Sequence, residues 1–405
     1  MAMKPMKALI SYEEATRILL EIAQPIRRAE RVPLLQASGR VLAEPILAAA
    51  DVPPFPRAAM DGYAVIAQDT FGAGNFNPAR LRLLEVVHAA DIAQGAVTTG
   101  ACIQVATGAP IPSGADAVVQ FEDTEVEAEG GTVKIYTPVY PRQNISSRGK
   151  DIQVGQTVLG AETRLDPSKI GVLAALGLTE VAVVAKPTVA VIPSGNEIVP
   201  PGEPLAPGKI YDINSYTLAA LVQDVGGVPR LFPIMKDTLE DVCRTLRDAL
   251  ACDLVVLSGG SSVGERDVIV EAVESLGEVK FHGIAVKPGK PTLCSVIDGK
   301  LVLGMPGYPT SCLTNAYGLL APALRKLAHL PTPRTRGVEL PMARRYTSTT
   351  GRHQYLPVRI EGGEVAPAFK ESGAITSMAD AEGYIEIPAN VDLVEKGERV
   401  LVKFF

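Results

Sequence analysis

Residues 253–276, DLVVLSGGSSVGERDVIVEAVESL, join a short apolar run, a glycine-rich turn and an amphipathic segment. The run 253–258 is rich in branched aliphatic residues, which predicts a buried strand. Apolar positions after the turn recur at helical spacing over 266–276. A strand, a turn and a helix in this order form the repeating unit of a doubly wound α/β sheet.

The same alternation extends over residues 187–328. Because strands that alternate with helices usually lie parallel, we expect one mostly parallel, doubly wound sheet. Asp237 or Thr238 is expected to cap one of its helices. The predicted strands are TVAVIP (188–193), TLCSVI (292–297) and KLVLGM (300–305), and the predicted helices are NSYTLAALVQDV (214–225), DTLEDVCRTLRDAL (237–250) and TSCLTNAYGLLAPALRKL (310–327).

The regions on either side have a different texture. Residues 11–28 predict an amphipathic helix capped by Ser11, and short apolar runs between turns predict a small β domain. The proline-marked segment 330–337 precedes further short strands, typical of a small barrel or sandwich. We therefore expect an α/β plus β chain of several domains: a helical and mixed N-terminal domain made of 1–50 and 143–186, an inserted β domain (51–142), the α/β domain (187–329) and a C-terminal β-barrel-like domain (330–405).

Composition excludes several classes. The chain has 405 residues and a formal net charge of −6, which disfavours a general nucleic-acid binder. No apolar stretch approaches the length of a membrane span, and the N-terminus lacks a signal-peptide core. The five cysteines have no C-x-x-C spacing and the four histidines are scattered, which argues against a zinc site or a redox dithiol. We expect a reduced, cytoplasmic protein without a membrane or nucleic-acid partner.

Three unusual loops each follow a predicted strand, and such loops meet at the carboxyl edge of a parallel sheet. They are PSGNEIVPPGEP (193–204), SGGSSVGERD (258–267) and GMPGYPTS (304–311). Consecutive backbone N–H groups in the second loop would form an anion-binding concavity. Glu265 and Asp267 at the end of this loop could hold a divalent cation, although Asp267 could equally be an N-cap. The first loop presents Glu197, for which a solvated side chain is the plain alternative.

Just upstream of the third loop, VKPGKP (286–291) presents Lys287 and Lys290 between prolines. Fixed lysines beside glycine-rich turns suit a phosphate or a small oxyanion, although solvated surface lysines are the alternative. Together these features predict a phosphate-bearing ligand bound with a hard cation such as Mg²⁺. A G-x-G-x-x-G fingerprint and a G-x-S-x-G elbow are absent, which disfavours a dinucleotide dehydrogenase and a serine hydrolase.

Three further polar residues stand out before the α/β region. Asp61 precedes a glycine in AAMDGYAV, Thr107 lies in the glycine- and proline-rich turn of ATGAPIPSGADAVV, and Asp151 lies in GKDI. An ordinary Asp-Gly turn, a plain tight turn and a solvated loop are the respective alternatives.

These segments together resemble the molybdopterin molybdenumtransferase family, which comprises MoeA and the E domain of gephyrin. The motifs run in the family's order over nearly the whole chain, and their combination is highly specific. They are PPFPRAAMDGYAV, ATGAPIPSGADAVV, PSGNE, KIYDINSY, SGGSSVGERD, VKPGKP, MPGYPTS and ESGAITSMADAEGYIEIP.

The resemblance implies the last step of molybdenum cofactor synthesis. The family takes adenylylated molybdopterin and molybdate, releases AMP and leaves the metal on the dithiolene sulfurs. It also implies an elongated homodimer whose site lies between the α/β domain of one subunit and the β domain of the other. The molybdopterin adenylyltransferase and acceptor molybdoenzymes are the further partners it suggests.

The resemblance assigns a role to individual residues. Glu197 and Asp267 would handle Mg²⁺ and the pyrophosphate, and Asp61 and Thr107 would come from the partner subunit. The positions tied to activity are Asp61, Thr107, Asp151, Glu197, Asp237 and Asp267. The expected ligand-binding positions are Ser258, Gly259, Gly260 and Gly264 for phosphate, and Lys287, Lys290, Pro291, Pro306, Pro309, Ser311, Arg352 and Ser372 for the pterin and molybdate.

Three positions depart from the family pattern. Tyr308 stands where Asn is usual, Asn196 where Asp is usual, and Lys150 where an acidic residue is usual. Tungstate has nearly the size and charge of molybdate, so a tungstate-preferring enzyme is one alternative. A molybdopterin adenylyltransferase and a scaffold protein without catalysis are the others.

Overall fold

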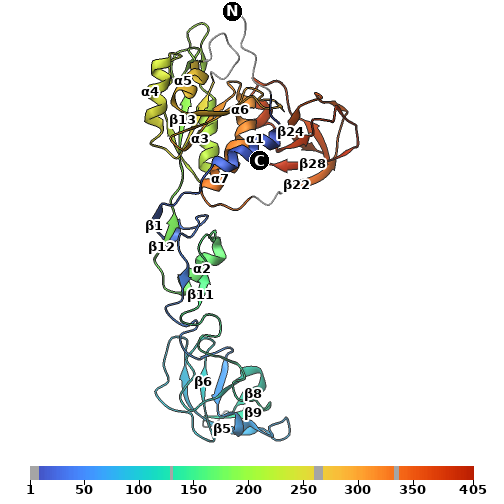
Figure 1. The fold of residues 1–405 in the computed structure, drawn as a ribbon. Helices are drawn as coiled ribbons and strands as arrows, with labels where there is room; N and C mark the ends of the chain where they lie inside the picture. Colours follow the sequence, from blue (N-terminus) through green and yellow to red (C-terminus); the bar gives the residue numbers. More distant parts are fainter. Residues whose placement is uncertain (1–8, 128–130, 260–267, 333–336) are drawn as a thin grey trace, which may run out of the picture. The chain divides into compact units, whose positions relative to one another are not determined.

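The computed structural model describes residues 9–127, 131–259, 268–332 and 337–405. The chain divides into two compact units (Figure 1). The large unit comprises residues 1–30, 39–41 and 183–405, and the small unit comprises residues 31–38 and 42–182.

The large unit contains a six-stranded sheet in the order β16-β13-β17-β21-β20-β18. The first four strands are parallel, whereas the pairs β21-β20 and β20-β18 are antiparallel. Asp298 and Gly299 both have positive φ, which makes a tight hairpin between β20 and β21. The strands are β13 (Thr188–Pro193), β16 (Val228–Leu231), β17 (Leu254–Ser258), β18 (Glu278–His282), β20 (Leu293–Ile297) and β21 (Lys300–Met305).

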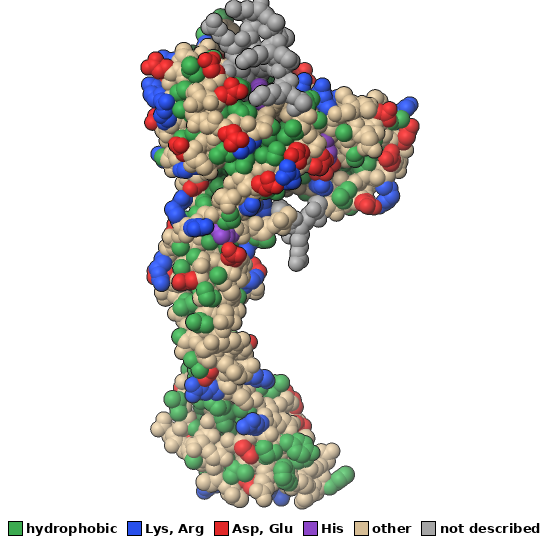
Figure 2. Space-filling model, viewed as in Figure 1, with side chains coloured by type: hydrophobic (Ala, Val, Ile, Leu, Met, Phe, Trp, Pro, Cys, Tyr) green, Lys and Arg blue, Asp and Glu red, His purple; other side chains and the backbone are tan. Residues whose placement is uncertain are grey.

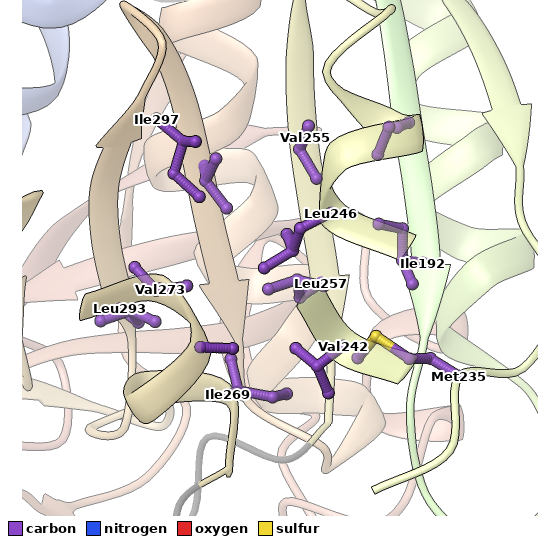
Figure 3. Close-up of a cluster of buried hydrophobic side chains, with 14 of the residues drawn as sticks. Ile192, Met235, Val242, Leu246, Val255, Leu257, Ile269, Val273, Leu293 and Ile297 are labelled. Atoms are coloured by element: carbon purple, nitrogen blue, oxygen red, sulfur yellow. The ribbon is translucent and has the colours of Figure 1, made fainter. Parts of the chain in front are cut away.

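Helices cover both faces of this sheet. Helices α4 (Leu239–Ala249) and α5 (Val268–Leu276) pack on one face, where alternate side chains of β13, β17 and β20 join a buried cluster (Figure 3). Thr238 caps α4, since its side chain accepts a hydrogen bond from the Asp241 N–H at 3.4 Å. On the other face lie α3 (Asn214–Asp224), α6 (Pro309–Asn315), the helical turn η4 (Ala316–Leu320), α7 (Ala321–Leu327) and α1 (Tyr12–Ile22).

Helix α1 packs within the large unit, although we assigned residues 1–50 to a domain with residues 143–186. Its buried Ala15 and Leu19 face this unit, and the Tyr12 hydroxyl donates to the Gly318 carbonyl at 2.7 Å. The helix is also shorter than the predicted 11–28, because Pro25 follows its end. Ser11 caps it as expected, accepting a hydrogen bond from the Glu14 N–H.

The C-terminal residues of the large unit form a second six-stranded sheet in the order β19-β24-β26-β28-β22, with β25 paired to β24. A bridge between Met342 and Val365 joins the end of β22 to β25, so the strand order closes on itself. Strand β19 belongs to the α/β segment of the chain but pairs with β24, so the α/β segment contributes a strand to the C-terminal sheet. The elements are β19 (Val286–Lys287), β22 (Gly337–Pro341), β24 (His353–Glu361), β25 (Glu364–Pro367), β26 (Gly383–Ile387), β28 (Arg399–Phe404), the pair β23 (Tyr346–Thr347) and β27 (Leu393–Val394), and α8 (Thr376–Ala379).

The small unit contains another six-stranded sheet, in the order β7-β4-β6-β5-β9-β8. Each face of the sheet is covered by a buried apolar cluster. Its strands are β4 (Gly62–Val65), β5 (Ala79–Val87), β6 (Ala101–Val105), β7 (Ala117–Gln120), β8 (Thr124–Val126) and β9 (Thr132–Ile135). Shorter elements are the pairs β2 (Ile46–Leu47) with β11 (Thr157–Leu159), β3 (Arg57–Ala58) with β10 (Ile145–Ser146) and β1 (Ala29–Pro33) with β12 (Glu180–Val184), the turns η1 (Leu34–Gln36), η2 (Ala67–Thr70) and η3 (Phe121–Asp123), and helix α2 (Pro167–Ala175).

Acidic and basic side chains are interspersed over the face of the molecule in Figure 2. With a formal net charge of −6, the chain must attract an anionic ligand through cations gathered at one place. Among the residues that the structure describes, no helix combines the length and apolar character needed to cross a bilayer.

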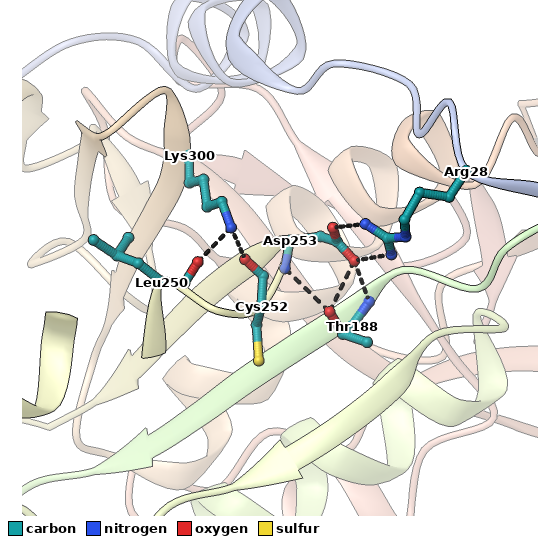
Figure 4. Close-up of polar contacts among 6 residues, drawn as sticks. All are labelled: Arg28, Thr188, Leu250, Cys252, Asp253 and Lys300. Atoms are coloured by element: carbon teal, nitrogen blue, oxygen red, sulfur yellow. Dashed lines mark hydrogen bonds and ion pairs between the residues drawn. The ribbon is translucent and has the colours of Figure 1, made fainter. Parts of the chain in front are cut away.

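A polar network ties the segment after α1 to the amino ends of β13 and β17 (Figure 4). Arg28 donates two hydrogen bonds to the Asp253 carboxylate, at 2.7 and 2.8 Å. The N–H and the hydroxyl of Thr188 donate to the same carboxylate, both at 2.8 Å. Burial raises the pKa of Asp253, but these donors outweigh burial and lower the pKa to about 2.

We expect Asp253→Asn to destabilise the large unit by about 2 kcal/mol at pH 7, because the folded carboxyl has a pKa below its unfolded value of 3.8. A lowered pKa stabilises the fold above about pH 4, and this contribution is lost as the pH falls towards about 2. Melting temperatures of both proteins between pH 7 and pH 2.5 test this. The difference should be several degrees at pH 7 and should shrink below pH 4; a constant difference contradicts the role of this carboxylate.

Candidate functional site

A cavity of about 820 Å³ lies in the large unit, where the loops after β13, β17 and β21 meet loops of the C-terminal sheet. These are the loops that the sequence places at the carboxyl edge. The predicted residues that line the cavity are Glu197, Ser258, Gly259, Lys287, Lys290, Pro291, Pro306, Pro309, Ser311, Arg352 and Ser372.

The loops after β13, β17 and β21 approach one another through backbone contacts. The Ser194 N–H donates to the Ser258 carbonyl at 2.9 Å, and the Gly259 N–H donates to Met305. Gly259 has φ +90°, and a Cβ there would lie 2.5 Å from the Ser194 carbonyl oxygen. A larger residue at position 259 would therefore push the loops apart and change the floor of the cavity.

Glu197 lines the cavity beside Asp237. The Glu197 carboxylate folds over Gly195, where a Cβ would lie 2.6 Å from its oxygen. Burial raises the pKa of Asp237, and the nearby Glu197 carboxylate raises it further, while a hydrogen bond from the Asn196 N–H opposes the change. Asp237 itself is not among the lining residues, and Thr238 rather than Asp237 caps α4. The pair therefore concentrates negative charge at one end of the site.

Cationic side chains line another part of the same cavity. Lys287, Lys290 and Arg352 all contribute to its wall, and Lys287 donates a hydrogen bond from Nζ to the Thr349 hydroxyl at 2.6 Å. The turn between the two lysines is fixed by helix α6, because the Asn315 side-chain amide donates to the Gly289 carbonyl at 2.9 Å. Fixed cations of this kind suit an oxyanion better than an apolar ligand.

The loop after β21 is anchored on both sides of the cavity. The Asn214 amide donates to the Gly307 carbonyl at 2.8 Å. The Thr310 N–H donates to the Ser372 carbonyl at 3.1 Å, and the Thr310 hydroxyl donates to Ala374 at 2.8 Å. These bonds bring Ser372 of the C-terminal region to the same wall as Ser311.

The structure adds lining residues that sequence reasoning did not assign. Asp212 is nearly buried and accepts a hydrogen bond from the Ser215 N–H at 3.1 Å. The Asn214 side-chain oxygen is buried without a hydrogen-bond partner among the described residues. Both lie in KIYDINSY, which we quoted as a motif without assigning roles, because an Asp before a helix usually serves only as a cap. Other additions are Ser194, Ile198, Ile210, Tyr211, Tyr308 and Thr349.

Four predicted residues, Gly260, Gly264, Glu265 and Asp267, lie outside the described residues. Within the described ranges, no group of three His, Cys, Asp or Glu side chains is arranged to hold a metal ion. The metal pair of Glu197 with Asp267 therefore stays a prediction.

The remaining predicted residues belong to the small unit. The Asp61 carboxylate accepts a hydrogen bond from the Thr107 N–H at 2.7 Å, so these two form one exposed cluster. A Cβ on Gly62 would lie 1.9 Å from the Val119 carbonyl, which explains the glycine after Asp61. Asp151 is also exposed, and its N–H donates to the Val52 carbonyl at 3.0 Å.

The cysteines near the cavity are poorly suited to act as nucleophiles. Cys294 and Cys312 are fully buried free thiols. Burial raises the pKa of Cys294 to about 12 and raises that of Cys312 as well, so neither forms a thiolate at neutral pH.

We expect Cys294→Ala and Cys312→Ala to keep the catalytic rate within about twofold, because an un-ionised buried thiol contributes packing rather than chemistry. The melting temperature, by contrast, should fall by a few degrees. AMP release measured on the folded variants tests this, and complete loss of activity with a normal fold would refute it.

Comparison with known proteins gives matches along the whole chain. Residues 10–177 match the model of the MoeA N-terminal region (domain I and II), residues 190–326 a probable molybdopterin-binding domain, and residues 339–405 the MoeA C-terminal region (domain IV).

Relatives match over nearly their full length. The molybdopterin molybdenumtransferase 2 of Mycobacterium tuberculosis is 33% identical over 97% of this chain and 98% of its own length. The molybdopterin molybdenumtransferase of Staphylococcus epidermidis is 31% identical over 94% and 91%, respectively. The solved structure of a molybdopterin biosynthesis MoeA protein from Pyrococcus horikoshii is 40% identical, covers 98% of this chain and 99% of its own, and superposes with a TM-score of 0.85.

Proposed function

This chain belongs to the MoeA family, and we propose that it is a molybdopterin molybdenumtransferase, which inserts molybdate into adenylylated molybdopterin and releases AMP. The observation that carries this proposal is the composition of the cavity wall. Glu197 lines the cavity together with the loops after β13 and β17. Lys287, Lys290 and Arg352 line another part of the same cavity. Such a site can hold a phosphate-bearing ligand and an oxyanion together.

We propose that the phosphoanhydride binds at the loops after β13 and β17. Ser258 and Gly259 line the cavity there and, with Gly260 and Gly264, would supply backbone N–H groups to the phosphates. Glu197 and Asp267 would hold Mg²⁺, and the donor chemistry fits, because the Glu197 carboxylate is a hard oxygen donor and the nearby Asp237 carboxyl adds acidic character. When bound, the cation neutralises charge on the phosphate oxygens.

We propose that the cationic wall holds molybdate. Lys287, Lys290 and Arg352 would supply charge, and Ser311 and Ser372 would supply hydrogen bonds. A molybdate oxygen or a water then attacks the phosphorus on the pterin side of the phosphoanhydride and forms a new P–O bond to it. The bond from this phosphorus to the bridging oxygen breaks, AMP leaves with that oxygen, and the proton of an attacking water passes to solvent. The residues hold both reactants in place, and no protein nucleophile is required.

We further propose an elongated homodimer of four-domain subunits with a shared active site. Asp61 and Thr107 of one subunit would complete the cavity of the other, and Asp151 would also contribute to activity. The cluster of Asp61 with Thr107 is exposed, so it is accessible to a second chain. The molybdopterin adenylyltransferase would supply the substrate, and cytoplasmic acceptor molybdoenzymes would receive the product.

The departure at Tyr308 keeps a second candidate open, the tungstate-preferring version of the same reaction. Its side chain is 67% exposed, lines the cavity, and stands where the family usually has Asn. A molybdopterin adenylyltransferase or a scaffold protein without catalysis would not need the cationic residues Lys287, Lys290 and Arg352 to bind an oxyanion.

Release of AMP tests the proposal. The purified protein is incubated with adenylylated molybdopterin, Mg²⁺, and molybdate, tungstate or neither. We expect release that depends on the oxyanion and is lost in Asp267→Ala, and the better oxyanion identifies the metal preference. Tight substrate binding without AMP release under either oxyanion would contradict the proposal and favour a carrier or scaffold.

A further inference from the structure

The Lys287 side chain is held by a residue that sequence motifs do not mark. Its Nζ donates to the Thr349 hydroxyl at 2.6 Å, across 62 residues of sequence. Both residues line the cavity. Thr349 is neutral, so the hydrogen bond fixes the ammonium without cancelling its charge. Lys287 is half-buried, and it keeps donors free for a ligand because an ammonium carries three.

The segment that carries Thr349 is itself fixed by the buried side chain of Gln354. Gln354 is 1% exposed, donates from Nε2 to the Tyr346 hydroxyl at 2.6 Å, and accepts from the Ser348 hydroxyl at 2.9 Å. The Ser348 N–H donates to the Asp392 carbonyl at 2.8 Å. A buried amide bonded on both sides restricts the loop to one arrangement, because any other would leave polar atoms unpaired.

The backbone of Lys287 is anchored to the same sheet. Strand β19 pairs with β24, and Lys287 lies opposite Gln354 in that register. The C-terminal sheet therefore holds Lys287 at two points: its backbone through β24 and its side chain through Thr349. Arg352 lies between these two anchors in sequence and lines the same cavity.

We propose that Thr349 is a positioning residue that holds the Lys287 ammonium towards the oxyanion, so that the C-terminal sheet sets the geometry of the anion site. This inference rests on the proposed function for its ligand. A lysine free to sample its rotamers loses conformational entropy when it binds an anion, and a lysine already held in place loses less. Removing the hydroxyl should therefore weaken oxyanion binding more than nucleotide binding.

The test compares the full-length wild-type protein with three variants, Thr349→Val, Thr349→Ser and Thr350→Val. Valine keeps the shape of threonine without the hydroxyl, serine keeps the hydroxyl, and the exposed neighbour Thr350 is the matched control. Calorimetry measures binding of molybdate alone, and steady-state assays measure KM for molybdate and KM for adenylylated molybdopterin separately. Melting temperatures report folding.

We expect Thr349→Val to raise the Kd and the KM for molybdate about fivefold to tenfold, the effect of immobilising one flexible side chain on binding. In Thr349→Val, the KM for the nucleotide substrate and the melting temperature should stay close to wild type. Thr349→Ser should bind molybdate as tightly as wild type, because it keeps the hydroxyl. An unchanged molybdate Kd in Thr349→Val, equal losses in the serine variant, or wild type that binds no molybdate would overturn the inference. Normal molybdate binding without AMP release would instead count against the proposed function alone.

Discussion

Glu197→Gln is expected to lower kcat for AMP release by about 100-fold, the loss typical when one group that stabilises developing charge is removed. Glutamine has nearly the same shape, so the fold and the Gly195 turn should persist. The change removes the negative charge that raises the pKa of Asp237. We therefore expect the Asp237 pKa to fall. The affinity for Mg²⁺ should fall as well, because the Glu197 carboxylate is lost, and this is measured as a rise in the Mg²⁺ concentration for half-maximal activity.

Glu203→Gln is the matched control for this experiment. Glu203 lies in the same 193–204 loop but is exposed and does not line the cavity. It should keep activity within about twofold of wild type, the range expected of a surface substitution. Equal activity of Glu197→Gln and wild type at all Mg²⁺ concentrations would remove Glu197 from the catalytic site.

Asp61→Asn and Glu197→Gln are each expected to have little activity alone, yet their mixture should recover activity. If the Asp61 of one subunit completes the cavity of the other, a mixed dimer contains one intact site and one site with both changes. Equal amounts that exchange freely give half mixed dimers, and therefore about a quarter of wild-type activity. The measurement is AMP release before and after the two proteins are mixed and allowed to exchange.

The double variant with both substitutions is the control, because mixing it with either single variant forms no intact site. If the exchanged dimers of the single variants gain nothing, Asp61 and Glu197 act within one chain or Asp61 has no part in the reaction. Size-exclusion chromatography of differently tagged variants would show that mixed dimers formed.

Local sequence patterns carry much of this structure. The strand–turn–helix alternation over 187–328 predicts the parallel strands, and the loops after β13, β17 and β21 meet at one cavity as the topology of such sheets requires. Glycines were informative because a close approach needs them, as at Gly259. Lys287 and Lys290 were visible because two prolines stiffen their loop.

Long-range contacts could not be predicted in the same way. Helix α1 has an apolar face that would fit any partner, so its packing with α7 was not visible in the sequence. Thr349 looks like any loop threonine, and only the fold brings it to Lys287. Asp212 precedes helix α3 and Asn214 is its first residue, so nothing in the local sequence marks their place on the cavity wall.

The most direct test of the account measures molybdenum transfer and AMP release in the same reaction. Wild-type protein is incubated with adenylylated molybdopterin, Mg²⁺ and molybdate, and the pterin product is separated and assayed for bound metal. The account predicts metal-loaded pterin and AMP in roughly equal amounts, with the rate of both lowered about 100-fold by Glu197→Gln. AMP release without metal on the pterin, or release at the same rate without any oxyanion, would contradict it.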